Sequence, residues 1–153
     1  MRELFVFCDG TNNTLRGGVE ETNVVRLYRH LQATLEPDDD VARFFYYDPG
    51  VGTPDTLPAA GPVEWLQGTL NRAAGLASGK GVYENIASAY LFLMRNWRGA
   101  DDKIFIFGFS RGAFTARCVA GMVNLFGIIR PQNEALLPTL VHTYFAAPDQ
   151  GGG

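Results

Sequence analysis

The sequence has few residues of the types that build disulfide networks or metal sites. Its 153 residues include two cysteines and two histidines. Cys8 and Cys118 each lie in an apolar segment, which is typical of buried free thiols rather than of a disulfide framework, and this indicates a reducing compartment. No metal site is predicted, and no cofactor is indicated.

Long apolar runs and an excess of one charge are also missing. The apolar run at residues 4–8 is too short for a signal peptide or a membrane span. The 13 basic and 16 acidic residues leave a net charge of -3, which provides no basic patch for nucleic acid or for a membrane surface. We therefore expect no nucleic-acid partner, no transmembrane segment and a cytoplasmic location in the producing cell.

What the sequence does contain is an alternation of β-prone and amphipathic segments, with 46% apolar residues overall. The pattern predicts strands at residues 4–8, 41–47 and 103–107, and helices at residues 23–35, 83–97 and about 111–126. The β-α-β-α-β order predicts one α/β domain over residues 1–153, with a doubly wound parallel sheet. Because residues 104–107 are all apolar, helices are expected on both faces of that strand.

Two segments fall outside this pattern. Residues 50–81 hold many prolines and glycines around a helix-like piece at residues 63–77. They predict an excursion over the sheet, either a lid over a site or ordinary packing at the sheet edge. Residues 147–153 end in three glycines and are predicted to be a tail.

The segment with the most chemical information is residues 108–112, Gly-Phe-Ser-Arg-Gly, which fits the pattern G-x-S-x-G. It follows a predicted buried strand and precedes a predicted helix, as a nucleophile elbow requires. Gly108 and Gly112 would remove collisions of side chains with neighbouring backbone in so tight a turn. We predict an α/β-hydrolase-like fold with Ser110 as the nucleophile. The alternative, that Ser110 is only a helix N-cap, requires neither glycine.

The helix after Ser110 is predicted to pack closely on the sheet and to stabilise an oxyanion. Its small residues suit close packing: Gly112, Ala113, Ala116 and Ala120. Its N-terminus points at the serine, so the backbone N–H of Arg111 is a predicted oxyanion donor.

The loop after the first strand is predicted to complete the oxyanion hole. Gly10 and Thr11 are candidate donors, and Asn12 adds a polar side chain that shapes the site. For Asp9, a turn-stabilising role and a direct role in shaping the site stay open.

A catalytic serine also needs a base, and the candidates are few. His142 follows Ser110 in the required order, with Glu134 or Asp149 as an orienting acid, but an ordinary histidine in a C-terminal helix or strand fits as well. His30 lies inside the first predicted helix. An apolar strand at residues 103–107 would also be an aggregation-prone edge, so further strands are expected, for which only residues 140–146 are available. Both observations indicate an incomplete N-terminal portion of a larger hydrolase.

Three sequence blocks resemble the α/β-hydrolase domain of the type VI secretion phospholipase effectors: FCDGTNN at residues 7–13, YDPGVGT at 47–53 and GFSRGAFTAR at 108–117. The resemblance spans residues 4 to about 130. It implies a lipase or phospholipase that cleaves ester bonds with Ser110, and a triad aspartate and histidine much further along a chain than this sequence extends. It also implies a phospholipid substrate, export without a signal peptide, and an immunity or secretion-apparatus protein as partner.

Two other functions are compatible with the sequence. One is a non-catalytic fragment or interaction module that keeps the elbow without a base. The other is a nucleotide-binding protein of Rossmann type, which the lack of G-x-G-x-x-G after the first strand disfavours.

Overall fold

The described part of the chain forms a three-stranded parallel sheet covered by helices. A computed structural model describes residues 1–10, 21–35, 40–50 and 80–146. The strands are β1 (Arg2–Cys8), β2 (Ala42–Asp48) and β3 (Lys103–Gly108), in the spatial order β2-β1-β3. The helices are α1 (Asn23–Thr34), α3 (Lys80–Asn96), α4 (Arg111–Phe126), the 3-10 helix η1 (Pro131–Leu136) and α5 (Leu137–Ala146). The predicted α/β class, the three parallel strands and the first three helices are confirmed.

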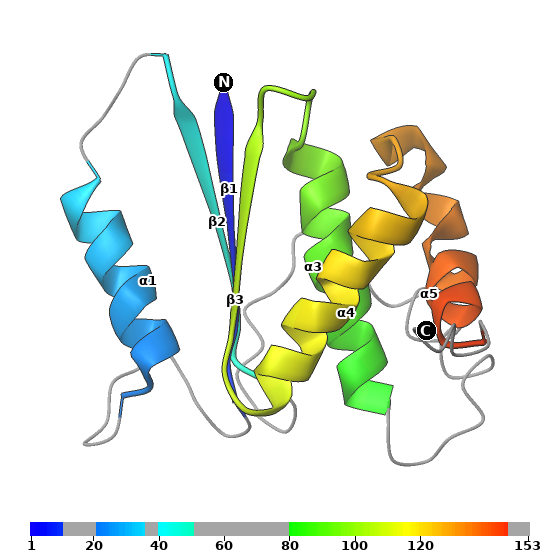
Figure 1. Cartoon of the computed structure of the whole chain (residues 1–153), viewed down its shortest axis with the longest axis horizontal. Coiled ribbons are helices and arrows are strands. Elements are labelled where there is room, and N and C mark those ends of the chain that lie inside the picture. Colours follow the sequence, from blue (N-terminus) through cyan, green and yellow to red (C-terminus); the bar gives the residue numbers. More distant parts are fainter. Residues whose placement is uncertain (11–20, 36–39, 51–79, 147–153) are drawn as a thin grey trace, which may run out of the picture.

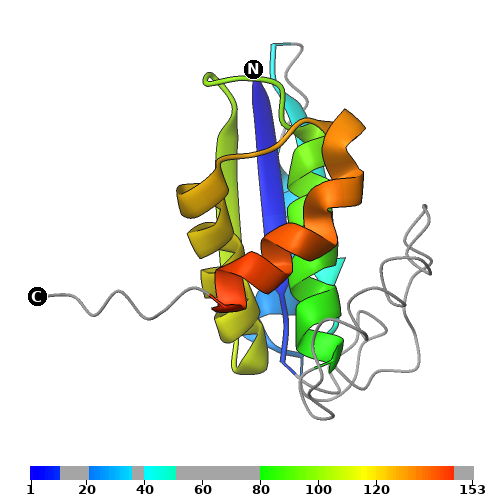
Figure 2. The same ribbon diagram turned by 90° about the vertical axis from the view of Figure 1, so that its right-hand side faces the viewer.

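Side chains of β1 alternate between two cores, as the pleat of a strand requires. Leu4, Val6 and Cys8 face the core beneath α3, α4 and α5, while Phe5 and Phe7 face α1. Figure 1 shows α1 on one side of the sheet and the other helices on the opposite side. Figure 2 shows α5 crossing α3 and α4 as an outer layer. Both faces of the central strand are therefore covered.

An aromatic row joins the three strands on the α1 face. Phe5 stacks between Phe45 and Phe105, with ring centroids 4.9 Å apart in both pairs. Phe105 is nevertheless 36% exposed. The α1 ring of Tyr28 packs on rings of β1 and β2, namely Phe7, Phe45 and Tyr47. The prediction that helices bury both faces of this strand is thus met only in part.

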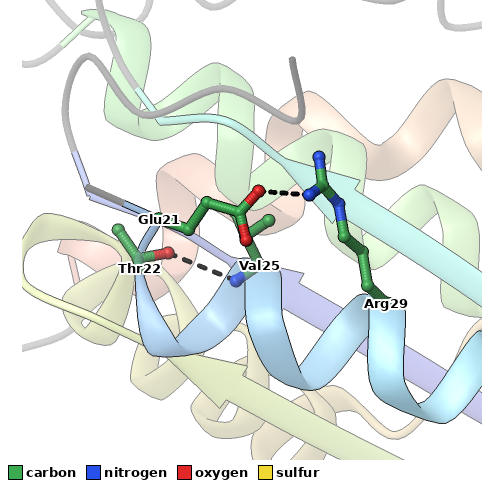
Figure 3. A network of polar contacts seen from close by, with 4 residues as sticks. All are labelled: Glu21, Thr22, Val25 and Arg29. Atoms are coloured by element: carbon green, nitrogen blue, oxygen red, sulfur yellow. Dashed lines mark hydrogen bonds and ion pairs between the residues drawn. The ribbon is translucent and has the colours of Figure 1, made fainter. Parts of the chain in front are cut away.

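The start of α1 is capped by a threonine side chain. The Thr22 hydroxyl accepts a hydrogen bond from the backbone N–H of Val25 at 3.2 Å, and Glu21 pairs with Arg29 about two turns further along (Figure 3). Such a side-chain cap satisfies one of the helix's orphan N–H donors and contributes about 1 kcal/mol.

Residues 140–146 do not supply the extra strand that the sequence analysis considered. They belong to α5, whose buried residues Leu137, Pro138 and Val141 recur at helical spacing. Within the described ranges β3 pairs only with β1, so its other edge has no neighbour there.

Among the described helices no single one is long and apolar enough to cross a membrane. The pair formed by α4 and residues 131–146 reaches the required length and composition, but it is bent by 111°.

Candidate active site

The carboxyl ends of the three strands meet at one edge of the sheet. Cys8 lies opposite Asp48 on one side and opposite Gly108 on the other, so the loops that follow β1, β2 and β3 are neighbours. In open parallel sheets ligands bind at this edge. Asp9, Gly50 and Ser110 all lie here.

Ser110 occupies a tight turn between β3 and α4. Its backbone has φ 54° and ψ -125°, and it is the only non-glycine residue with positive φ in the described part of the chain. A backbone held in such a sparsely populated conformation costs about 1–3 kcal/mol and is found mainly at functional sites. Hydrogen bonds brace the turn, from Phe109 N to Cys8 O (3.0 Å) and from Gly112 N to Phe109 O (2.9 Å).

The two flanking glycines are required by contacts with backbone. A Cβ on Gly108 would lie 2.5 Å from the carbonyl oxygen of Gly112, and a Cβ on Gly112 would lie 2.1 Å from that of Cys8. Real Cβ atoms do not approach so closely. The steric reason given for G-x-S-x-G in the sequence analysis therefore applies in this fold.

Ser110 stands at the N-cap position of α4 but does not cap it. Its hydroxyl makes no capping hydrogen bond, in contrast to the hydroxyl of Thr22 on α1, and its side chain is exposed. The alternative that Ser110 serves only as an N-cap is therefore not supported.

The predicted close packing of α4 on the sheet is found for Gly112 and Ala116, which are buried, but not for Ala120, which is exposed. Ala120 lies on the outer face of the helix.

Asp9 anchors the loop after β1. Its side chain is fully buried; Oδ1 accepts the N–H of Gly10 at 2.7 Å, and Oδ2 accepts the hydroxyls of Thr22 at 2.6 Å and Tyr47 at 2.8 Å. These charge-assisted hydrogen bonds tie β1, α1 and β2 together. The bond to Gly10 stabilises the turn, and the bonds to Thr22 and Tyr47 fix the position of the loop; a direct role of Asp9 in shaping the site stays a prediction.

The predicted oxyanion donors differ in availability. The backbone N–H of Arg111 has no acceptor within the described ranges, whereas that of Gly10 is donated to Asp9. Thr11 and Asn12 lie outside the described residues, as do residues 51–79 with the suggested lid. The prediction for Gly10 thus requires that its N–H be released from the carboxylate.

A second buried carboxylate, Asp48, was missed by the sequence analysis. Its Oδ1 accepts the N–H of Gly50 at 2.9 Å, and Asn85 of α3 also bonds its side chain. Gly50 has φ 82° and contacts the Gly10 backbone so closely that a Cβ would lie 2.5 Å from Gly10 O. The sequence did contain a signal for this second carboxylate: an aspartate directly follows an apolar run both at residues 7–9 and at residues 46–48.

Burial raises the pKa of the Asp48 carboxyl from its usual 3.8 to about 6, with a smaller contribution from the charge of Asp9. The folded protein then holds this proton more tightly than the unfolded chain does. We predict that the free energy of unfolding falls as the pH rises from about 4 to about 6, and that Asp48→Asn removes this slope. Urea unfolding at several pH values measures it.

The exposed Asp101 offers a matched control for this experiment. Asp101→Asn should keep the wild-type slope between pH 4 and pH 6. An Asp48→Asn variant whose stability depends on pH as the wild type does would contradict the prediction.

Ser110 opens into a pocket of about 610 Å³ between α4 and α5. The residues that line it in the described part of the chain are Ser110, Ala113, Phe114, Arg117, Cys118 and Tyr144. Phe114 is 52% exposed and Phe109, next to the serine, is 50% exposed. An apolar surface thus adjoins the hydroxyl. Local sequence patterns do not reveal this pocket, because its two walls come from different helices.

Neither histidine lines this pocket. His142 lies exposed on α5 and His30 lies exposed on α1. Glu134, one suggested acid, pairs with Arg95 at 3.0 Å, and Asp149 lies outside the described residues. No three His, Cys, Asp or Glu side chains gather as metal ligands within residues 1–10, 21–35, 40–50 and 80–146. The role of His142 as base stays a prediction.

Comparisons with known proteins place this geometry in context. The family model described as "T6SS, Phospholipase effector Tle1-like, catalytic domain" matches residues 2–151. The uncharacterized protein YEL023C of Saccharomyces cerevisiae is 33% identical over 141 residues. That match covers 89% of this chain but 19% of the yeast protein, so the chain spans about a fifth of the length of this relative. No solved structure matches.

Proposed function

Because this chain belongs to the family of Tle1-like phospholipase effector catalytic domains of the type VI secretion system, we propose that it is a serine hydrolase that cleaves carboxylic ester bonds of phospholipids. The observation that carries the proposal is the strained backbone of the exposed Ser110 between β3 and α4, with glycines on either side. A capping or packing serine has no need of this conformation.

The proposed reaction starts with attack of Ser110 Oγ on the ester carbonyl, while a base removes the hydroxyl proton. The negative charge on the carbonyl oxygen is stabilised by the Arg111 N–H and by the positive end of α4. The alcohol part of the lipid leaves, and water then releases the fatty acid from the acyl-serine. Phe109 and Phe114 offer apolar surface to the acyl chain.

Two sources of the base are compatible with the chain. One is His142, after a movement that brings α5 closer to the serine. The other is a group outside the described residues or in a partner. The similar yeast protein YEL023C, of which the match covers 19%, shows that such a domain can be part of a much longer chain. In the second case we propose that the chain keeps the serine and the fold of a larger α/β-hydrolase but is not active alone.

Family membership also supports two proposals about the cell. We propose that the protein is made in the cytoplasm and is exported without a signal peptide. We further propose that an immunity protein or a component of the secretion apparatus binds it. The support for both is the family description alone.

Fluorophosphonate labelling of the purified chain tests the proposed serine chemistry. We expect an adduct on Ser110, located by mass spectrometry, and none on the Ser110→Ala variant. An adduct shows that the serine is activated by a base within the chain. A folded chain without any adduct contradicts an autonomous hydrolase and leaves the interaction module or fragment.

A further inference from the structure

Arg117, in the pocket beside Ser110, carries a charge that no described carboxylate neutralises. It lies on α4 and its side chain is exposed. Three other arginines each form an ion pair with a glutamate: Arg29 with Glu21, Arg43 with Glu3 and Arg95 with Glu134. Arg117 makes no such pair within the described ranges. Its guanidinium is therefore open to a ligand in the pocket.

Arg117 lines the same pocket as the nucleophile. Ser110, Phe114 and Arg117 follow one another at helical spacing and line one pocket. Seven residues of α-helix correspond to a rise of roughly 10 Å between Ser110 and Arg117. Long side chains on a helix lean toward its N-terminus, which is the direction of Ser110 from Arg117.

The other described residues of the pocket are neutral or apolar. Neither α4 nor α5 contains Asp or Glu. Burial raises the pKa of the Cys118 thiol and of the Tyr144 hydroxyl, so both stay uncharged at neutral pH. Phe114 presents a half-exposed ring. Among the described lining residues, one cation, two aromatic rings and no acid suit a ligand that carries an anionic group next to an acyl chain.

We infer that Arg117 binds the phosphate of a glycerophospholipid whose ester bond is presented to Ser110, and so makes the site select phospholipids over neutral acylglycerols. The inference rests on the proposed ester hydrolysis at Ser110. The planar guanidinium can donate two parallel hydrogen bonds to phosphate oxygens, which a point charge such as lysine cannot. Arg117 is thus a specificity-determining residue rather than part of the chemical step.

Binding of ether lipids tests the inference without any need for turnover. The probes are a short-chain dialkylglycerophosphate, the matching dialkylglycerol without phosphate, and inorganic phosphate, each titrated by calorimetry into the full chain. We expect the wild type to prefer the dialkylglycerophosphate over the dialkylglycerol by at least about tenfold, in line with a charge-assisted pair. Arg117→Gln should remove most of this preference, and Arg117→Lys should retain part of it.

Arg26 provides the matched control, since it is exposed on α1 across the sheet from the pocket. Arg26→Gln makes the same change of charge and should bind like the wild type. An unchanged preference in Arg117→Gln overturns the inference. Displacement of the ether lipid by inorganic phosphate at equal concentration also overturns it, because the site would then bind free phosphate.

The two proposals can fail independently in these experiments. Since an ether lipid contains no ester, binding that depends on Arg117 can occur in a chain whose Ser110 is not labelled, and only the proposed hydrolysis is then lost. If Ser110 is labelled but the preference for the dialkylglycerophosphate is the same in Arg117→Gln as in the wild type, the phosphate site is rejected and the proposed hydrolysis stands.

Discussion

Gly112→Ala is expected to abolish stable folding. The new Cβ would lie 2.1 Å from the carbonyl oxygen of Cys8, 2.4 Å from its carbonyl carbon and 2.5 Å from the carbonyl oxygen of Asp9. All three atoms belong to the backbone at the end of the central strand, which cannot move without disturbing both of its neighbours. We expect a loss of about 4 kcal/mol or more, a large share of the stability of a typical domain. Urea unfolding followed by circular dichroism measures it.

Gly99→Ala is the control for this variant. Gly99 lies in the turn before β3, and a Cβ there meets nothing within 4 Å. Its stability should stay within about 1 kcal/mol of the wild type. If Gly112→Ala proves as stable as Gly99→Ala, the close packing of α4 against the end of β1 is not as described.

Removal of the Ser110 hydroxyl should have the largest effect on activity. For a chain that hydrolyses a soluble ester, Ser110→Ala is expected to reduce kcat by about 10⁴-fold or more, as loss of the nucleophile does in other serine hydrolases. Ser110→Gly should lose as much, because it also lacks the hydroxyl. Turnover of a fluorogenic short-chain ester measures both variants.

The same two variants separate chemistry from strain. Alanine keeps the Cβ in a backbone at φ 54° and ψ -125°, whereas glycine adopts positive φ without penalty. Ser110→Gly should therefore be more stable than Ser110→Ala by about 1 kcal/mol. Thr143→Ala, at an exposed hydroxyl on α5, should change neither turnover nor stability. Turnover that survives in Ser110→Ala would place the nucleophile elsewhere.

Much of the fold could be predicted because local sequence patterns specify its helices and strands. The strands β1, β2 and β3 are short apolar runs, and α1, α3 and α4 are amphipathic segments with recognisable ends. The elbow is equally local: two glycines around Ser110, after a strand and before a helix, specify a turn with few alternatives. Residues 140–146 were ambiguous because a short apolar run suits a strand or a helix. In the structure the segment is helical, and as α5 it packs against α3 and α4.

The sequence by itself determined the order of the elements, the parallel sheet and the position of the serine, since each depends on residues close together in the chain. Only the tertiary structure decided that Asp9 takes the Gly10 N–H and two hydroxyls from other elements, that Asp48 is buried beside it, and that Arg117 shares a pocket with Ser110. These are contacts between side chains that local patterns do not specify. They arise when the packing of the elements brings distant residues to one edge of the sheet and excludes water from the carboxylates there.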